Sequence, residues 1–420
     1  MKNYLLTIAL ISVVISLPGK SQTLQEVIDT ALVLSPELKM MEAKVNASAN
    51  RVEQNTNLPD PMFSFGFMNL PTSTFSFNEE PMTMAVVGLS QEFPFPGKLS
   101  AAADVNRKDV AISKQEYYDI RNDLVKKVSQ SYYELQFIRE EKRLLEEQIN
   151  LMKDISEVVN VMYSVSEASQ QNLLRIDLEI SNMYEMLSEV KGEESEKLST
   201  LNAFLFRDSN SKINTDQFPI IYFTVFTLNE LESVAKQNRP YLIGVNQAIE
   251  KAKLNQSVAE YDYYPMFKIW AQYGFRGEIE STGMDLDNML SFMVDVSIPL
   301  NYGGKVTAMV EENVSMQQMY EEQYSTSLQM LRREFGMILA KLNSLEERIK
   351  LIEQGSLIQA RENLKTSFTS YQVGEIDFMS VIEAQNNLYS LEKNLYALKT
   401  DYLNQVAELE FLTGTNLSKE

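Results

Sequence analysis

The sequence predicts an internally duplicated α+β membrane protein, with four β-strands and several very long helices in each chain. Three observations indicate this fold class. The same landmarks recur in both halves at a nearly constant spacing, which is typical of a tandem duplication. Short segments alternate apolar and polar residues with a period of two, which favours strands. Much longer segments carry apolar residues at alternating steps of three and four, which favours coiled-coil helices.

The composition excludes several classes of function. The 420 residues include 38 Lys and Arg against 58 Asp and Glu, a formal charge of −20, and there is no His and no Cys. A Ser-His-Asp triad, a Cys nucleophile and a zinc site built from thiolates and imidazoles are therefore impossible. The surplus of acids argues against a nucleic-acid partner, because duplex affinity depends on Lys and Arg at phosphates. Serine-lysine and paired-carboxylate chemistry remain open, but we expect no catalytic site, cofactor or metal site.

Residues 1–21 have the pattern of a secretory signal peptide. Lys2 supplies the basic start, an uncharged run extends from Tyr4 to Leu17, and Gly19 and Ser21 are the small residues of a cleavage site. The run is shorter than the ~20 apolar residues of a spanning helix. No later stretch approaches that length, so we expect the mature chain to enter a membrane, if it does, as strands.

Two repeats, residues 22–206 and 227–420, follow the signal peptide, and a polar linker or equatorial segment at 207–226 joins them. Each repeat is expected to contain a helix, a β-hairpin and two long helices. The spacing between matching landmarks is 204 residues at first and then 207 and 208, for the pairs Thr23 and Thr227, Pro36 and Pro240, Pro61 and Pro265, Gly97 and Gly304, and Tyr163 and Tyr371. A slow drift of this kind is what small insertions leave in a duplicated chain.

The predicted β-hairpins cover residues 62–93 and 266–298. Strands of about ten residues with one apolar and one polar face match transmembrane β-barrels, although a soluble sheet packed on helices would show the same alternation. Four strands cannot close a barrel, so two or more chains must contribute, and three chains would supply twelve strands. Lys268, Gln272 and Asp295 lie on the polar faces of their strands, and we expect them to point into the lumen.

The long helices are expected from Ser100 to Met162 and from Lys305 to about Gln372. The second of these contains no proline and would be ~100 Å long at about 1.5 Å per residue. Two apolar seams, from Leu328 to Ile352 and from Val381 to Tyr402, have the spacing of a coiled coil. Helices of this length cannot fold over a compact core, so we expect a rod or a tube.

Motifs in both repeats resemble the TolC-like outer membrane factor family, and most of all its heavy-metal efflux branch. In chain order they are Leu58-Pro59-Asp60-Pro61, Met68-Asn69, Phe93-Pro94-Phe95-Pro96-Gly97-Lys98, the two Tyr-x-Val-x-Glu turns and Leu409-Glu410-Phe411-Leu412-Thr413-Gly414. The resemblance implies a homotrimer with a twelve-stranded β-barrel in outer membrane lipid and an α-helical barrel across the periplasm. It also implies a passive conduit rather than an enzyme, served by a periplasmic adaptor and an inner-membrane pump, usually of the resistance-nodulation-division type.

The resemblance places the periplasmic entrance and the adaptor contact at the two helix turns. Their residues are Tyr163, Val165 and Glu167 in the first repeat and Tyr371, Val373, Gly374 and Glu375 in the second. Gly374 supplies the backbone freedom that a reversal of direction needs. Two carboxylates three residues apart form stacked rings at the constriction in the family's best-known member, and those positions correspond to Ser380 and Glu383. Only Glu383 is acidic, so the gate has one charged ring or also uses Asp377.

The cargo and two alternatives stay open. Heavy-metal ions or small toxic compounds are the expected cargo, and an exit duct for secreted polypeptides is the alternative channel. A periplasmic coiled-coil adaptor or structural tether is the alternative from a different class of protein. The 21 methionines could supply soft thioether ligands to a metal in transit, or they could fill irregular packing gaps.

Overall fold

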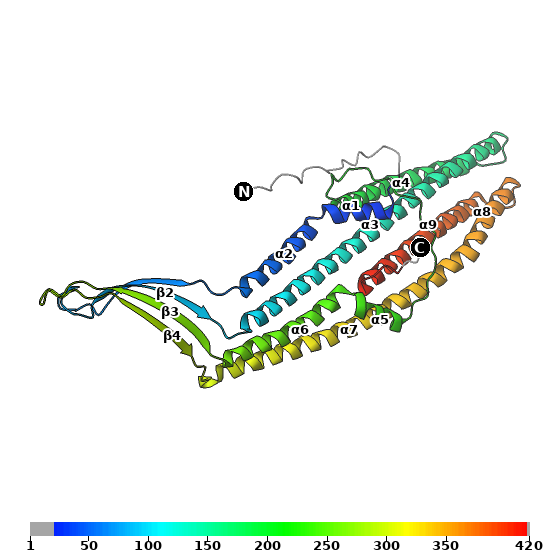
Figure 1. Ribbon diagram of the computed structural model, residues 1–420. Helices are drawn as coiled ribbons and strands as arrows, with labels where there is room; N and C mark the ends of the chain where they lie inside the picture. Colours follow the sequence, from blue (N-terminus) through cyan, green and yellow to red (C-terminus); the bar gives the residue numbers. More distant parts are fainter. Residues whose placement is uncertain (1–20, 418–420) are drawn as a thin grey trace.

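The chain is an elongated molecule with a four-stranded sheet at one end and two helical hairpins at the other (Figure 1). The computed structural model describes residues 21–417. The predicted signal peptide, residues 1–21, therefore lies outside the described residues except for its last position. Within the described part, no helix is both long enough and apolar enough to cross a membrane.

The two repeats contain the same main elements in the same order. The first contains α1 (Leu24–Leu34), α2 (Pro36–Thr56), β1 (Met62–Met68), β2 (Met84–Phe93), α3 (Lys98–Ser164) and α4 (Gln170–Phe204). The second contains α5 (Leu228–Asn238), α6 (Pro240–Glu260), η1 (Tyr261–Tyr263), β3 (Met266–Phe275), β4 (Met289–Ser297), η2 (Tyr302–Gly304), α7 (Lys305–Leu351), η3 (Ile352–Ser356), α8 (Leu357–Gln372) and α9 (Phe378–Thr413). Between the repeats, residues 205–227 form an irregular connection in which Thr215 makes a β-bridge with Gln22.

Both repeats begin with the same local chemistry. The hydroxyl of Thr23 accepts a hydrogen bond from the backbone N–H of Glu26 at 3.2 Å, and the hydroxyl of Thr227 accepts one from Glu230 at 3.3 Å. Each glutamate side chain in turn accepts from the threonine N–H at 3.2 Å. Such a capping box satisfies backbone donors that a helix start leaves free. The next helices, α2 and α6, both begin at a proline, whose fixed φ suits the first helical position.

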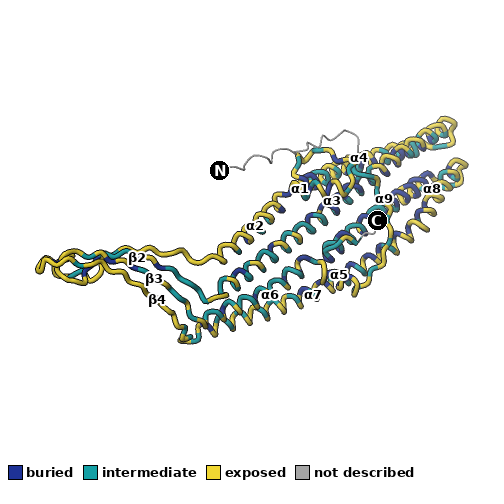
Figure 2. Tube along the Cα trace, in the orientation of Figure 1, coloured by how far each residue is buried: buried dark blue, intermediate teal, exposed yellow. Residues whose placement is uncertain are grey.

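The strands pair antiparallel in the order β1-β2-β3-β4, so β2 and β3 join the two repeats and β1 and β4 are free edges. The register sets Lys268 opposite both Glu92 and Asp295. These are the only charged residues of the four strands, and they lie on one face, here called the polar face. The other face, here called the aromatic face, carries Phe63, Phe65 and Phe67 with the other odd-numbered residues of β1 to β3 and the even-numbered ones of β4. Much of the sheet is exposed in a single chain (Figure 2).

The predicted coiled-coil seams form the larger of the two hydrophobic cores. On α7 the buried residues of the seam are Leu331, Phe335, Ile338, Leu342, Leu345 and Ile349. On α9 they include Val381, Ala384, Leu388, Leu395, Leu398 and Tyr402. Two predicted seam members, Leu328 and Leu391, are only partly buried, and α9 instead buries Glu392, whose carboxylate accepts from Arg361 at 2.8 Å. This core therefore extends along the interfaces between the long helices and is not a compact globular core.

The segment predicted as one long helix from Lys305 to about Gln372 is helical throughout, but it is not α-helical throughout. A π-helical turn at Ile352–Ser356 separates α7 from α8, while α3 continues unbroken for 67 residues. The spacing between the repeats increases by one, from 207 at the start of these helices to 208 at their end. A π turn absorbs one extra residue without breaking the helix. We therefore attribute the π turn to a single-residue insertion in the second repeat.

Candidate functional site

The two hairpin ends have the same backbone geometry, built by a Schellman motif. At the end of α3, Glu167 N donates to Met162 O at 2.8 Å and Ser166 N donates to Tyr163 O at 3.0 Å. At the end of α8, Glu375 N donates to Ser370 O at 2.9 Å and Gly374 N to Tyr371 O at 3.0 Å. The motif needs one residue in the left-handed region. Gly374 supplies it at φ 76°, as its predicted freedom suggests, and Ser166 supplies it at φ 66°.

The two hairpin ends also contact each other. Asn172 on α4 donates to the hydroxyl of Tyr371 at 3.2 Å, and Arg175 Nη1 lies 2.8 Å from Met379 Sδ on α9. Tyr371 is buried and its ring centroid lies 5.0 Å from that of Phe378. Beside these contacts lies a cavity of about 350 Å³, which residues from 167–175 and 371–378 line from both sides. Of the seven predicted docking residues, Tyr371 is thus the one that holds the ends together rather than facing solvent.

The predicted gate residues lie on the first two turns of α9. Asp377 is the N-cap, its side chain makes no capping hydrogen bond, and its carbonyl accepts from Ser380 N at 3.1 Å. Asp377 and Glu383 are exposed, and Ser380 is partly buried. Within the described chain no ion pair involves Asp377 or Glu383.

The gate residues of α9 have counterparts in the first repeat that were not predicted. The spacing of 208 residues that relates the two turns also relates Glu383 to Arg175 and Ser380 to Asn172. Both counterparts are α4 residues whose side chains contact the second repeat. The repeat spacing was therefore the signal that could have found them.

Above the hairpin ends, buried polar side chains join α3 to α9. Gln385 is fully buried and donates to Gln148 Oε1 at 2.8 Å. One turn further along α9, the hydroxyl of Tyr389 donates to the buried Glu141 at 3.4 Å, and Lys393 forms an ion pair with the same carboxylate. Burial, together with the Glu141 charge, raises the pKa of Tyr389. These pairs fix which turn of α3 faces which turn of α9, because a shift would leave buried polar groups without partners.

The predicted lumen residues share the polar face of the sheet. Lys268 Nζ lies 3.8 Å from a carboxylate oxygen of Glu92 on β2, and the register puts Asp295 directly opposite Lys268 on β4. Gln272 lies on the same face, is buried, and donates to Met68 Sδ at 2.9 Å. The sheet thus places on one face the three residues that the alternation singled out.

The junction between sheet and helices accounts for the Phe-Pro-Gly-Lys motif. Gly97, the N-cap of α3, has φ 97°, and a Cβ there would lie 2.6 Å from the hydroxyl of Tyr261. Phe95 stacks on Tyr264 with ring centroids 4.5 Å apart, and Lys98 forms an ion pair with Asp262. Glycine is needed for both its backbone conformation and its lack of a side chain. The motif therefore locks the two repeats together where the chain changes from strand to helix.

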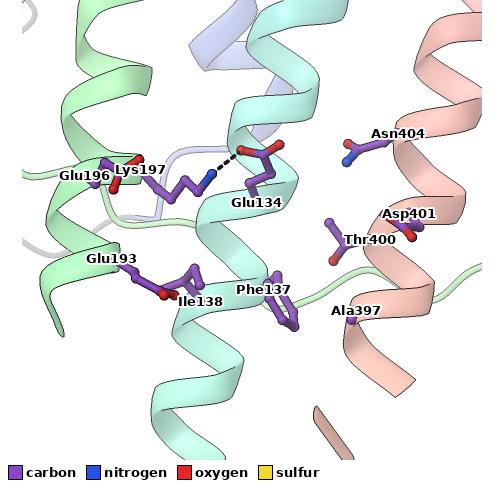
Figure 3. A pocket seen from close by; sticks show the side chains of 10 residues that line it. All are labelled: Glu134, Phe137, Ile138, Glu193, Glu196, Lys197, Ala397, Thr400, Asp401 and Asn404. Atoms are coloured by element: carbon purple, nitrogen blue, oxygen red, sulfur yellow. Dashed lines mark hydrogen bonds and ion pairs between the residues drawn. The ribbon is translucent and has the colours of Figure 1, made fainter. Parts of the chain in front are cut away.

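A groove of about 420 Å³ lies between α3, α4 and α9, midway along the helices (Figure 3). Lys197 on α4 donates to Glu134 on α3 at 3.0 Å, and Thr400, Asp401 and Asn404 of α9 form the opposite wall. Although several acids line this groove, the described residues contain no group of three or more His, Cys, Asp or Glu placed to hold a metal ion.

The family model described as "Outer membrane efflux protein" matches residues 27–163 and 231–415, which is most of the chain. The chain belongs to this family. It is 23% identical to the outer membrane protein TolC of Vibrio cholerae over 419 residues, covering 94% of this chain and 91% of that protein. It is 22% identical to the cation efflux system protein CusC of Escherichia coli over 338 residues, covering 78% of this chain and 71% of that protein. The solved structure of CusC superposes with a TM-score of 0.75 at 18% identity, covering 93% of this chain and 92% of that one.

These comparisons confirm the predicted fold class and family. The protein is an outer membrane efflux channel that extends into the periplasm, and it is not an enzyme. The alternative of a periplasmic adaptor is wrong, because both repeats match the channel family. The likeness to CusC and to a second cation efflux relative of the same name agrees with the heavy-metal branch that the motifs resemble.

Proposed function

We propose that three copies of this chain form a passive exit duct of a tripartite efflux system, loaded from an inner-membrane pump through a periplasmic adaptor. The observation that carries the proposal is the four-stranded sheet, which has one aromatic face, one polar face and two free edges. Free edges are not tolerated in lipid, and small transmembrane barrels begin at about eight strands. Three chains supply twelve strands, with β4 of one chain pairing with β1 of the next.

The polar face lines the lumen in this assembly, and the aromatic face contacts outer membrane lipid. The support is the segregation of charge, since Glu92, Lys268 and Asp295 all lie on the polar face and the aromatic face carries no charged residue. An exposed lysine on a lipid face costs about 2–4 kcal/mol at the bilayer midplane and an acid costs less, so the opposite orientation is disfavoured. Lys268, Gln272 and Asp295 are therefore assigned to the wall of the duct.

The two hairpin ends are assigned to the adaptor. Val165 and Val373 are 60% and 67% exposed at the two apices, and each stands next to an acid, Glu167 or Glu375. The two turns have the same backbone geometry, and each exposes a valine. An adaptor could therefore make the same apolar contact with both turns. Tyr163 is partly exposed beside them, and the buried Tyr371 sets the distance between the ends.

The constriction is assigned to the start of α9. Glu383 and Asp377 are exposed without an ion pair in the described chain, and threefold symmetry would turn each into a ring of like charges. Ser380 lies between them and adds no charge. A ring of carboxylates attracts cations and resists close packing. Arg175, at the equivalent position of the first repeat, supplies a positive group that can pair with this ring when the ends close.

Heavy-metal cations are the first candidate cargo. The support is the 22% identity to CusC, a cation efflux system protein, together with the acidic sequence. Small toxic compounds are the second candidate, and the pump is expected to be of the resistance-nodulation-division type. The metal is cargo in this proposal, and no residue is required to retain it.

The test is planar bilayer recording of the purified full-length protein, with its mass measured in detergent. A trimer that gives discrete K⁺ conductance steps is expected, and a stable monomer or a silent trimer would contradict the proposal. Glu383→Ala should reduce the preference for K⁺ over Cl⁻ in reversal-potential measurements. Glu362→Ala is the matched control, because Glu362 is also an exposed acid and lies on the neighbouring helix α8. Equal effects of the two variants would remove Glu383 from the gate.

A further inference from the structure

The methionines of the sheet all lie on one face. The four strands contain Met62, Met68, Met84, Met266, Met289 and Met293, and the register puts every one of them on the polar face. The aromatic face of the described strands contains Phe, Tyr, Leu, Ile, Val and Ala but no Met. The polar face, conversely, contains no Leu, Ile or Phe. Apart from the methionines, the apolar side chains of the polar face are those of Val86 and Trp270, so every methionine of the four strands is confined to this face.

Gap filling does not explain this division. Methionine is a good filler of irregular buried spaces. Met84 is buried, but Met62, Met266 and Met293 are 60%, 43% and 51% exposed and therefore do not fill buried spaces. A filler would also be expected on the aromatic face, where the bulkiest side chains meet. The division instead follows the chemistry of the thioether.

Three of these methionines converge at the loop end of the sheet, and they are here called the outer thioether cluster: Met68, Met84 and Met289. Met68 lies directly opposite Met84 in the register, and Met289 lies directly opposite Gly274. The sulfur of Met84 occupies the space above Gly274, 2.4 Å from where a Cβ would stand. Gln272 donates its amide N–H to the sulfur of Met68 at 2.9 Å and so holds that side chain in place.

We propose that the outer thioether cluster binds soft monovalent metal cations, Cu(I) or Ag(I), on their way out of the barrel. Thioether sulfur is a soft ligand that favours such ions over Mg²⁺ or Ca²⁺. Met68 and Met84 face each other on adjacent strands, where side chains are close enough to share a ligand. The Met84 sulfur lies above Gly274 of β3, the residue directly opposite Met289 of β4, and this brings it toward the third thioether. The proposal deepens the proposed function and rests on it, because the polar face must line the lumen. A site on an export path must also release its ion, which suits weak neutral ligands better than carboxylates or thiolates.

Gly274 is the residue that makes the cluster possible. An alanine there would place its Cβ in the position of the Met84 sulfur, which is the far end of a flexible side chain and can move away. Gly274→Ala should therefore separate Met84 from Met289 while the sheet stays intact. This variant keeps every methionine and changes only their arrangement.

The experiment titrates Ag(I) into the purified full-length trimer in chloride-free buffer by calorimetry, and records K⁺ currents of the same samples in planar bilayers. Wild-type protein should bind Ag(I) at one site per chain, and Ag(I) should reduce its K⁺ current. The variant Met68→Leu/Met84→Leu/Met289→Leu should bind Ag(I) at least about 100-fold more weakly. Mutating only the residues that support metal ligands already costs about 10- to 100-fold in affinity, and this variant removes the ligands themselves. Gly274→Ala should weaken binding in the same direction.

The control is Met40→Leu/Met330→Leu/Met337→Leu, which removes three exposed methionines from helices and should bind Ag(I) like wild type. Absence of Ag(I) binding in a conducting wild-type channel would overturn the thioether site and leave the proposed channel intact. Equal Ag(I) affinity in the sheet triple variant and wild type would do the same. A wild-type protein that gives no K⁺ conductance would overturn the channel, and the lumen site with it.

Discussion

Gly374 and Gly414 offer a matched pair of substitutions that separates backbone strain from steric contact. Both glycines follow a long helix and both have φ 76°. A Cβ at Gly374 would meet nothing within 4 Å, since this residue lies at an exposed hairpin end. A Cβ at Gly414 would lie 2.4 Å from the carbonyl oxygen of Asn238 and 2.8 Å from Arg239 Cα. Gly414 thus lets the end of α9 lie directly against the backbone that connects α5 to α6.

The expected costs follow from these distances. The left-handed conformation costs a non-glycine residue ~1–2 kcal/mol, and this term is common to Gly374→Ala and Gly414→Ala. Overpacking adds ~1–3 kcal/mol where atoms cannot move aside, and at Gly414 the opposing atoms are backbone. We therefore expect Gly414→Ala to destabilise each chain by ~1–3 kcal/mol more than Gly374→Ala.

Thermal unfolding in detergent, followed by far-ultraviolet circular dichroism at one fixed heating rate, measures the difference. Gly374→Ala should lower the Tm slightly, and Gly414→Ala should lower it clearly further. Equal Tm values for the two variants would refute the reasoning, because the strain would then come from φ alone. Gly414→Ser also places a Cβ against the backbone of Asn238 and Arg239, so it should lower the Tm as clearly as Gly414→Ala does.

Three further predictions concern single positions. Ser166→Gly should stabilise the first hairpin end by about 1 kcal/mol by removing left-handed strain, which hydrogen exchange at residues 160–170 would detect as slower exchange. Phe335→Ala, which empties a fully buried seam position, should cost ~3–5 kcal/mol in unfolding experiments, and a cost under 1 kcal/mol would contradict the assigned core. Hydrogen bonds from Arg332 and Lys236 lower the pKa of Glu232 from 4.5 to about 2. The ionised carboxylate therefore stabilises the folded chain fully above pH 4.5, and this stabilisation is lost as the pH falls toward 2. Glu232→Gln should flatten the fall in Tm over that range, and an unchanged fall would show that other acids cause it.

Much of the fold could be predicted from the sequence because the deciding patterns are local. The alternation in Met266–Phe275 and Met289–Ser297 reports that each strand has two unlike faces, whatever its partner is. The threonine and glutamate of each capping box lie three residues apart in the chain. The repeat spacing likewise needs no tertiary information, and it even contains the extra residue that became the π turn.

The candidate site was predictable only in part, because its residues meet across long sequence separations. The position of Glu383 follows from the motif, but its relation to Arg175 and Met379 depends on how α4 crosses to α9. Gln148 and Gln385 are 237 residues apart, and nothing in either neighbourhood indicates that they form a buried pair.

The sequence by itself determined the two repeats, the number and polarity of the strands, and the length of the helices, because periods of two and of three to four are written in neighbouring residues. The tertiary structure alone decided which of these faces meet. Strand register gathered Met68, Met84 and Met289 from three strands onto one face, and the absent side chain of Gly274 left room for a sulfur. Methionine spacing along the chain could not predict this, since cross-strand neighbours are set by hydrogen-bonded pairing and not by sequence distance.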